Sequence, residues 1–307
     1  MTRARAVEPS PRTAAADVGV VIVTHNRLAL LRQCLASVRR QTAPPAFILV
    51  IDSGSTDGTA AWLDAQPDLR VCHLPNRGGA WAYHVGIREA QAQGATWLLL
   101  LDDDCEVAPT YLADGLALAR AMQAADPADA VFTGRVWETG RKVFFYGVEN
   151  GRWRSAPLYP DRPCPSEALG FPFLLLHRSV VEAVGLPYTF WFIVNDDVEW
   201  TRRMRRHGFR LHLLPVEAGV HHARHERHRV RWLGRSLAGY APWKTYYVLR
   251  NGIILARLEG APRLGAALRH LPHVAARLLH PDRRRERLRL ALRGWWDGLR
   301  FDLSKVE

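Results

Sequence analysis

Residues 97–104 read WLLLLDDD, a short apolar run followed at once by three adjacent carboxylates. An apolar run of this length, bounded by polar residues, is typical of a strand buried on both faces of a parallel sheet. Three similar runs precede it, and segments with helical spacing separate the four. This alternation predicts βα units, and therefore an α/β fold with a mostly parallel, Rossmann-like sheet flanked by helices. The expected strands are Val18–Thr24, Phe47–Ile51, Val71–Leu74 and Thr96–Leu101, and the expected helices are Leu28–Gln41, Thr59–Gln66 and Ala80–Gln93.

The pattern changes after the fourth unit. Residues 127–172 contain short aromatic runs between proline and glycine turns, which indicates either an inserted segment or a mixed half of the sheet. A helix is expected over Asp197–His207, a strand over Phe209–Leu214, and helices from Lys244 onward. The predicted segments are a mobile tail at 1–17, two halves of one domain at 18–135 and 136–255, and a basic helical extension at 256–307.

Charge is distributed unevenly along the 307 residues. The net charge is +12, but residues 1–200 sum to −4 and residues 201–307 to +16. Such a basic C-terminal third indicates either an anionic contact, such as a membrane surface or a phosphate-bearing acceptor, or a solvated arginine-rich face. No apolar stretch approaches the ~18–20 residues that span a bilayer, so any membrane contact is expected to be peripheral. The four cysteines form no CxxC pair, which argues against a disulfide framework and favours a reducing cytoplasm.

Polar clusters follow three of the expected strands, at the edge where a parallel sheet collects its ligands. They occupy residues 24–27, 52–58 and 102–104. Three adjacent carboxylates repel one another unless a cation offsets their charge, and oxygen ligands on a loop suit Mg²⁺ or Mn²⁺. In an extended loop Asp102 and Asp104 point to one side and Asp103 to the other. The local alternatives are a helix cap for the acidic triplet and an ordinary turn for residues 52–58.

Two later segments also carry candidate chemistry. Residues 76–80 open a helix with two glycines, so their amides and Arg77 could approach a pyrophosphate. The segment FWFIVNDDVEW at 190–200 places several acids at the start of a helix, where they act either as dipole partners or as a general base beside aromatic walls.

Histidines follow the strand-like stretch HLLPVEAGV at 212–220. One of the adjacent pair His221 and His222 could complete the shell of a metal held by the acidic triplet. A separate zinc site with His225 and His228 is the competing interpretation, but the spacing lacks a cysteine pair or an HExxH core.

Taken in order, six segments resemble the motifs of family 2 glycosyltransferases, which have the GT-A fold. They are VVIVTHNR, VIDSGSTDG, NRGGAWAYHVGI, LLLLDDD, FWFIVNDDVEW and PVEAGVHH, and the resemblance covers roughly residues 18–255. A YYxxRN segment, echoed by Tyr246, Tyr247, Arg250 and Asn251, makes the chain similar to the rhamnosyltransferase-like and galactofuranosyltransferase-like branch.

The resemblance implies a role for each matching position. The residues implied to hold the nucleotide base and ribose are Thr24, Asn26, Arg27 and Asp52. Those implied to line the diphosphate and sugar are Asn76, Arg77 and Gly79, and further donor contacts are expected from Asp102 and Asp103. The metal ligands would be Asp102 and Asp104 of the DxD motif and His221, with His222 left open as an alternative. The catalytic base would be Asp197, with Asp196 left open.

The implied function is that of an inverting, metal-dependent glycosyltransferase using Mn²⁺ or Mg²⁺. It would move rhamnose, galactofuranose or a similar sugar from a nucleotide-diphosphate donor to a hydroxyl of a glycan or lipid-linked acceptor. Residues 18–135 would bind the nucleotide sugar, and residues 136–255 would bind the acceptor and carry the catalytic base. The QxxRW motif of processive synthases is missing, so transfer of one or a few sugars is implied. The expected location is the cytoplasm, with peripheral contact of the basic extension at the inner face of the cell membrane.

Two other classes of protein share parts of this pattern. A sugar nucleotidyltransferase has the same type of fold and the same need for a metal, but such enzymes usually open with a glycine-rich loop followed by an activating Arg or Lys, unlike VVIVTHNR. A basic nucleic-acid-binding protein is suggested only by the charge of the C-terminal third. Three lysines and no recognition module argue against it, so no nucleic-acid partner is expected.

Overall fold

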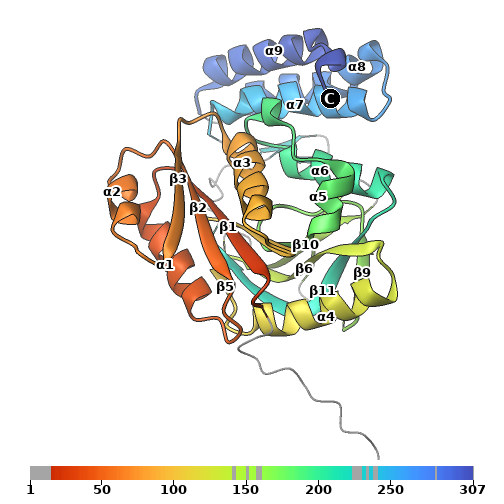
Figure 1. Ribbon diagram of the computed structural model, residues 1–307. Coiled ribbons are helices and arrows are strands. Elements are labelled where there is room, and N and C mark those ends of the chain that lie inside the picture. Colours follow the sequence, from red (N-terminus) through yellow and green to blue (C-terminus); the bar gives the residue numbers. More distant parts are fainter. Residues whose placement is uncertain are drawn as a thin grey trace, which may run out of the picture.

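A mixed α/β sheet forms the centre of the molecule (Figure 1). The computed structural model describes residues 15–139, 143–149, 152–156, 161–222, 230–232, 235–237, 241–280 and 282–306. All but the last three residues of the predicted tail at 1–17 therefore lie outside the described residues. The strands of the sheet are β1 (Val18–Thr24), β2 (Phe47–Ser53), β3 (Leu69–Leu74), β4 (Trp97–Asp102), β5 (Cys105–Val107), β6 (Asp129–Glu138), β7 (Val143–Glu149), β8 (Arg152–Ala156), β9 (Cys164–Ser166), β10 (Leu174–His177) and β11 (Arg210–His221).

The strand order along the sheet is β3-β2-β1-β4-β10-β6-β11-β5. The four strands of the first half are parallel to one another, and β6 and β11 continue in the same direction. Of the strands from β3 to β11 in this order, only β10, between β4 and β6, is antiparallel to its neighbours; β5, at the end of the order, is antiparallel to β11. The predicted mostly parallel α/β sheet is confirmed, and β1 has the predicted bounds. β2 and β3 are each two residues longer than predicted because they pair in register from Ile48 with Leu69 to Ser53 with Leu74.

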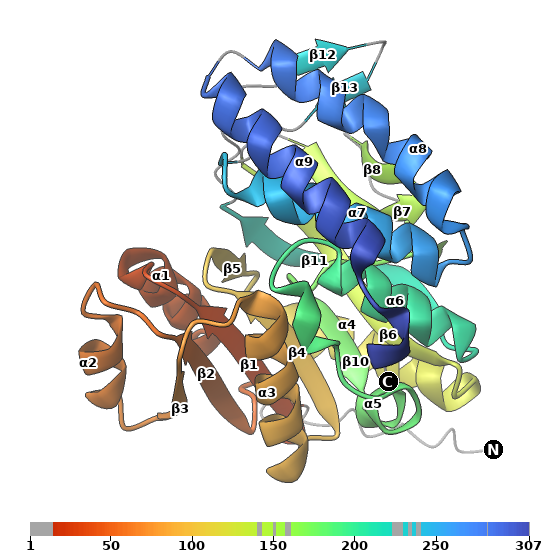
Figure 2. The same ribbon diagram turned by 90° about the horizontal axis from the view of Figure 1, so that it is seen from above.

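Helices cover both faces of the sheet (Figure 2). They are α1 (Leu28–Arg39), α2 (Thr59–Asp64), α3 (Gly79–Ala92), α4 (Tyr111–Ala125), α5 (Arg178–Val184) and α6 (Asp196–Arg206), with a 3-10 turn η1 (Thr189–Trp191) before α6. β12 (Val230–Trp232) and β13 (Arg235–Leu237) form a separate antiparallel pair.

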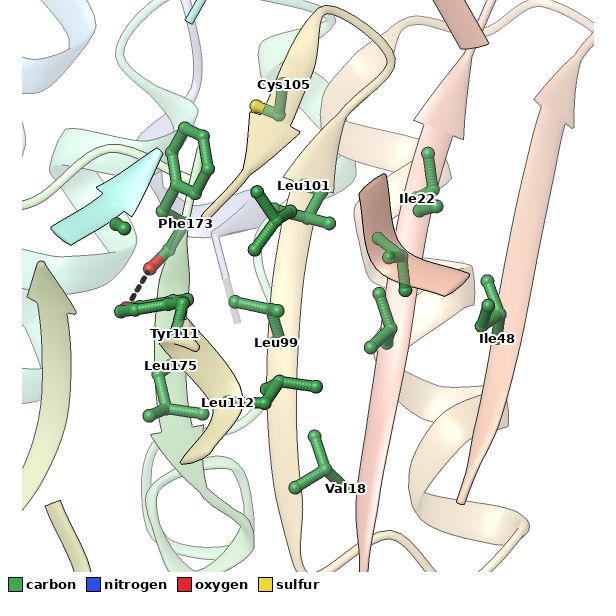
Figure 3. Packing of buried hydrophobic residues seen from close by; sticks show 14 of the residues in the cluster. Val18, Ile22, Ile48, Leu99, Leu101, Cys105, Tyr111, Leu112, Phe173 and Leu175 are labelled. Carbon is green, nitrogen blue, oxygen red and sulfur yellow. Dashed lines mark hydrogen bonds between the residues drawn. The ribbon is translucent and has the colours of Figure 1, made fainter. Parts of the chain in front are cut away.

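The run that predicts the fold is buried on both faces. Leu99 and Leu101 of β4 pack in the cluster beside α1 and α4, and Leu98 and Leu100 pack in the cluster beside α3 and α5. Figure 3 shows the first cluster, where the Tyr111 hydroxyl donates a hydrogen bond of 3.0 Å to the backbone carbonyl oxygen of Phe173, the residue before β10. A strand with apolar side chains on both faces needs cover on both, which the βα connections supply.

The last strand extends past Leu214. β11 continues from the predicted strand Phe209–Leu214 through the strand-like stretch HLLPVEAGV to His221, past a register shift between Leu213 and Glu217. Beyond this shift β11 pairs with β5 as well as β6. At Gly219, where φ is +145°, a Cβ atom would lie 2.0 Å from the Glu106 carbonyl oxygen, so only glycine allows this approach. The extension brings His221 opposite Cys105, next to the acidic triplet.

The C-terminal segment forms a helical layer at one end of the molecule, drawn in blue in Figures 1 and 2. It contains α7 (Lys244–Leu258), α8 (Arg263–Ala275), α9 (Arg284–Arg300) and the short turns η2 (Ala276–Leu279) and η3 (Leu303–Lys305). α9 lies against α7 because Gly294 and Gly298 carry no side chain; a Cβ at Gly294 would lie 2.2 Å from the Tyr246 carbonyl oxygen. Among the residues that the structure describes, no helix is long and apolar enough to cross a bilayer.

Candidate active site

The acidic triplet occupies the turn between β4 and β5. Asp102 is the last residue of β4, and Asp103 and Asp104, both buried, form the turn itself. The Tyr83 hydroxyl of α3 donates a hydrogen bond of 2.6 Å to Asp102 Oδ1. The alternative of a helix cap is wrong, because β5 follows the triplet and the next helix begins only at Tyr111. Burial, together with the neighbouring charge of Asp104, raises the pKa of Asp102.

The end of β1 is tied to this turn. The Thr24 hydroxyl donates to Asp103 Oδ2 at 2.9 Å, and Arg27 Nη1 lies 3.1 Å from Asp103 Oδ1 and 2.8 Å from Asp104 Oδ2. Burial raises the pKa of Asp103 to about 7 in spite of Arg27. Two of the three clusters predicted to meet at the sheet edge are therefore in direct contact.

A group able to hold a metal ion lies beside this contact. One ligand atom from each of Asp102, Asp104 and His221 lies within 4.8 Å of the others, and His221 Nε2 is 3.1 Å from Asp104 Oδ1. The adjacent His222 instead contacts Glu106 at 3.1 Å. No hydrogen bond of acceptable geometry from the described residues reaches the buried Asp104 Oδ1. The buried Asp104, the partly buried Asp102 and the imidazole of His221 fit a hard divalent cation, which would offset the charge of the two carboxylates.

The second cluster combines a turn with a candidate binding residue. Asp52 is buried at the end of β2, where Oδ1 accepts from the Ser55 amide at 3.0 Å and Oδ2 lies 2.9 Å from His73 Nδ1. The turn alternative is correct for Asp57, which accepts from the amides of Thr59 and Leu28, the first residues of α2 and α1.

Asn26 links the first two clusters through its side chain and its backbone. Its Oδ1 accepts from the Thr56 amide at 2.7 Å, and its backbone amide donates to Ser55 Oγ at 2.9 Å. Asn26 itself has a left-handed backbone with φ of +53°. The loops after β1 and β2 are thus joined at the sheet edge, next to the acidic turn.

The glycine loop before α3 rests on a distant segment of the chain. Gly78 has φ of +92°, and a Cβ there would lie 2.2 Å from the Phe192 carbonyl oxygen, which also accepts from the Ala80 amide at 3.2 Å. Asn76 Oδ1 accepts from the Gly78 amide at 3.0 Å, and the exposed Arg77 lies over the Trp81 ring at 4.9 Å. The loop therefore keeps a fixed position and leaves the cation of Arg77 accessible.

The two candidate bases are the first residues of α6, and the charge of Asp102 in the acidic turn acts on both. Asp197 Oδ1 accepts from the Val198 amide at 2.7 Å. Burial, with the charge of Asp197 beside it, raises the pKa of Asp196 to about 8, and burial raises that of Asp197 to about 6. The charge of Asp102 also raises both values, so all three carboxyls share one electrostatic environment. Glu199 is engaged elsewhere, in a buried ion pair with Arg203 at 3.0 Å.

Two contacts of the site were not predicted. Tyr83 was quoted only as part of NRGGAWAYHVGI and Asn251 only as part of YYxxRN, yet Tyr83 hydrogen bonds to Asp102 and Asn251 to the segment before Asp196. Helical spacing alone could have placed Tyr83 on the buried face of α3, four residues after Gly79. No local signal indicates the partner of Asn251. The alternative zinc site includes His225 and His228, which lie outside the described residues.

A family model supplies the assignment that the geometry leaves open. The model of glycosyl transferase family 2 matches residues 19–183. The chain belongs to this family. Membership confirms the predicted family and makes the chain a glycosyltransferase.

Curated relatives of this family 2 member fall in the predicted branch. Galactofuranosyltransferase GlfT1 of Mycobacterium tuberculosis (strain ATCC 25618 / H37Rv) is 30% identical over 78% of this chain and 83% of its own length. The dTDP-rhamnosyl transferase RfbF of Shigella flexneri is 26% identical over 81% of this chain and 82% of its own length. The predicted likeness to galactofuranosyl- and rhamnosyltransferases is confirmed.

Solved structures of similar fold are glycosyltransferases of the GT-A type. The crystal structure of GalNAc-T7 with UDP, GalNAc and Mn²⁺ has a TM-score of 0.57 at 19% identity, over 78% of this chain and 47% of that one. This chain thus spans about half the length of GalNAc-T7. The mannosyltransferase PcManGT from Pyrobaculum calidifontis, in complex with GDP-Man and Mn²⁺, has a TM-score of 0.50 at 20% identity. The match covers 94% of this chain and 76% of PcManGT. The predicted GT-A fold is confirmed.

Proposed function

We propose that this family 2 glycosyltransferase is an inverting, metal-dependent enzyme that transfers a rhamnose- or galactofuranose-like sugar from a nucleotide diphosphate. The observation that carries the proposal is the meeting of Asp102, Asp104 and His221 at the end of β4. The charge of Asp102 also raises the pKa of both carboxyls at the start of α6. The names of the relatives, one a galactofuranosyltransferase and one a dTDP-rhamnosyl transferase, support the choice of sugars. The solved structures of GalNAc-T7, with UDP and Mn²⁺, and of PcManGT, with GDP-Man and Mn²⁺, support the donor and metal classes.

The donor is proposed to bind along the joined loops of the sheet edge. Asp52, Asn26, Thr24 and Arg27 would hold the nucleoside, as the resemblance implies. Asn76, Arg77 and Gly79 would contact the diphosphate and sugar, since an accessible guanidinium and the amides at a helix start suit phosphate oxygens. Asp103 would act within the protein, by keeping Thr24 and Arg27 in place.

Asp102, Asp104 and His221 are proposed to hold Mn²⁺ or Mg²⁺. When bound, the ion supplies positive charge that stabilises the diphosphate leaving group. The choice of His221 over His222 rests on the distance to Asp104, since His222 contacts Glu106.

Asp197 is proposed to accept the proton of the acceptor hydroxyl as that hydroxyl attacks the anomeric carbon. One carboxylate acting in a single displacement inverts the anomeric configuration. Asp197 is only partly buried, whereas Asp196 is buried and the charge of Asp197 raises its pKa further, so Asp197 is the better base of the two. A raised pKa in a buried carboxyl is typical of a general base.

The variant Asp197→Asn tests the mechanism, with Asp196→Asn as its matched control. We expect Asp197→Asn to lower kcat by about 10²- to 10⁴-fold, the usual contribution of general-base catalysis, with donor affinity retained. Asp196→Asn, which replaces an already neutral group, should lower kcat much less. Donor panels with Mn²⁺ would follow transfer, and thermal shift would follow donor binding. Near-normal turnover of Asp197→Asn, or the reverse order of the two variants, would remove Asp197 from this role.

The acceptor is proposed to be lipid-linked, with the C-terminal helices resting on an anionic membrane. Leu264, Leu268 and Leu271 are spaced along one side of α8 and are 71%, 55% and 42% exposed. On α9 Leu292 and Trp296 are also exposed, 50% and 53%, and they lie among arginines. Residues 263–300 contain ten arginines against three carboxylates, a net charge of +7. Apolar side chains beside clustered cations are typical of helices that lie on anionic bilayers, while two copies of so basic a face repel each other.

A further inference from the structure

The loop that leads into the proposed catalytic carboxyls has an unusual backbone. Phe192, Val194 and Asn195 all have positive φ angles, of 65°, 70° and 68°, and none of them is glycine. A β-branched residue such as Val194 rarely adopts this conformation, because its side chain then clashes with the backbone. The loop cannot hold this shape by its own preferences, so contacts from outside must hold it.

Asn251 supplies those contacts from α7. Its side chain is fully buried, and its Nδ2 donates to the carbonyl oxygens of Trp191, Ile193 and Val194 at 3.0, 2.7 and 2.9 Å. Two N–H bonds serve three carbonyls, so at least one of them is shared. On the other side of the amide, Oδ1 accepts from Arg250 Nη1 at 2.8 Å, which identifies the oxygen and the nitrogen of the amide.

A second contact from α7 holds the same loop. The Phe192 and Tyr247 rings stack at 4.8 Å with an interplanar angle of 11°. Arg250 Nη1 also donates to the Phe190 carbonyl at 3.0 Å. On the other side of the loop, the Phe192 carbonyl oxygen accepts a hydrogen bond from the backbone amide of Ala80. The loop therefore lies between α7 and the start of α3.

We propose that Asn251 is a positioning residue for glycosyl transfer: with Tyr247, it holds the loop at 190–195 so that Asp197 and the glycine loop before α3 keep their relative places. The proposal rests on the function proposed above and deepens it. Asn251 touches no reacting atom in this arrangement; it acts through the three carbonyls and then through the first turn of α6. The structural reason is direct, because Asp196 follows Asn195 without an intervening residue.

The test uses the full chain and two independent readouts. Asn251→Asp keeps the shape of the side chain but removes the N–H donors, so the three carbonyls lose their partner. Hydrogen exchange measured by mass spectrometry on residues 190–197 reports the loop, and steady-state kinetics with Mn²⁺ and a nucleotide-diphosphate rhamnose or galactofuranose donor report catalysis. We expect faster exchange in this segment and a fall in kcat on the order of 10- to 100-fold, as misplacing a catalytic group by about 1 Å does, with the KM for the donor nearly unchanged.

Leu249→Ala is the matched control. Leu249 is on the same helix and equally buried, but it packs against Val274 and Ala291 instead of the loop. It should destabilise the chain while leaving kcat and the exchange of residues 190–197 close to wild type. Asn251→Ala repeats the test without a buried charge. If neither Asn251 variant folds, Tyr247→Leu, at a side chain that is only partly buried, decides through the same readouts.

The outcomes separate this proposal from the proposed function. Unchanged exchange, or kcat within twofold of wild type, in the folded variants overturns the positioning role. An equal fall in kcat for Leu249→Ala overturns it too, because the effect would then follow general stability. If the wild-type chain transfers no sugar from any donor, the proposed function fails, and the exchange comparison alone still decides whether Asn251 holds the loop.

Discussion

At the scale of single residues, neighbouring side chains of the same type differ sharply in environment. Asp196 and Asp197 are adjacent, yet their pKa values are about 8 and about 6. His221 and His222 are adjacent, yet one lies against Asp104 and the other against Glu106. A sequence pattern places such pairs together but does not say which member faces the site, because that depends on residues far along the chain.

Transfer should depend on pH through Asp197. Burial is the main cause of its raised pKa of about 6. A raised carboxyl pKa means that the base is protonated and inactive below about pH 6. We therefore expect kcat/KM to fall about tenfold per pH unit below 6 and to level off above it. Steady-state rates from pH 5 to 8 would measure this, with tryptophan fluorescence to verify that the chain stays folded; a flat profile across pH 6 would speak against the assignment.

At the scale of elements, the pairing of β11 with β5 brings the imidazole of His221 to the acidic turn. The strand predicted to end at Leu214 continues because its register shifts against β6 and it then pairs with a three-residue strand. Alternate apolar residues continue past Leu214 at Val216, Ala218 and Val220, so the strand itself can be followed in the sequence. Its pairing with β5 cannot, because the two strands lie far apart in the chain. The backbone at Gly219, rather than the hydrophobic pattern, makes the pairing possible.

Gly219→Ala should therefore weaken metal binding as well as stability. The added methyl group meets the Glu106 carbonyl at 2.0 Å, so β11 and β5 must separate, at a cost of about 1–3 kcal/mol, typical of overpacking. The control is Gly208→Ala: Gly208 also has positive φ, +90°, but no atom lies within 4 Å of an added Cβ. Urea unfolding and the rise in Tm caused by Mn²⁺ would measure the two effects. Loss of the Mn²⁺ response in both variants, or in neither, would contradict this role of the β11–β5 pair.

At the scale of the whole molecule, the catalytic sheet edge and the C-terminal helices are one connected structure. α7 contacts the loop before α6, and α8 and α9 pack on α7. A membrane-facing role for α8 and α9 would therefore connect the membrane to the loop at 190–195 through α7. The exposed leucines of α8 and the arginines of α9 make that role testable.

Vesicle binding should depend on the α8 leucines and on lipid charge. We expect the chain to sediment with phosphatidylglycerol vesicles and not with phosphatidylcholine vesicles, and the variant Leu264→Ser, Leu268→Ser, Leu271→Ser to sediment several-fold less. A matched triple change at exposed uncharged residues of α1, α2 and α3, Gln33→Ser, Ala61→Ser and Ala92→Ser, keeps the net charge and controls for substitution elsewhere on the surface. Equal sedimentation of the leucine variant and the wild type would contradict the proposal, and a change in oligomeric state instead of sedimentation would indicate contact between copies.

The sequence by itself determined the βα units, the parallel sheet and the family, because apolar runs and their spacing are local properties that each segment carries alone. It also placed the DxD carboxylates at a strand end, since the end of an apolar run marks the sheet edge. Only the tertiary structure decided that the imidazole of His221, rather than that of His222, lies against the Asp104 carboxylate, that Tyr83 donates a hydrogen bond to Asp102, and that Asn251 holds the loop before Asp196. Each of these depends on burial and on contacts between segments distant in the chain. The local pattern of residues predicts neither.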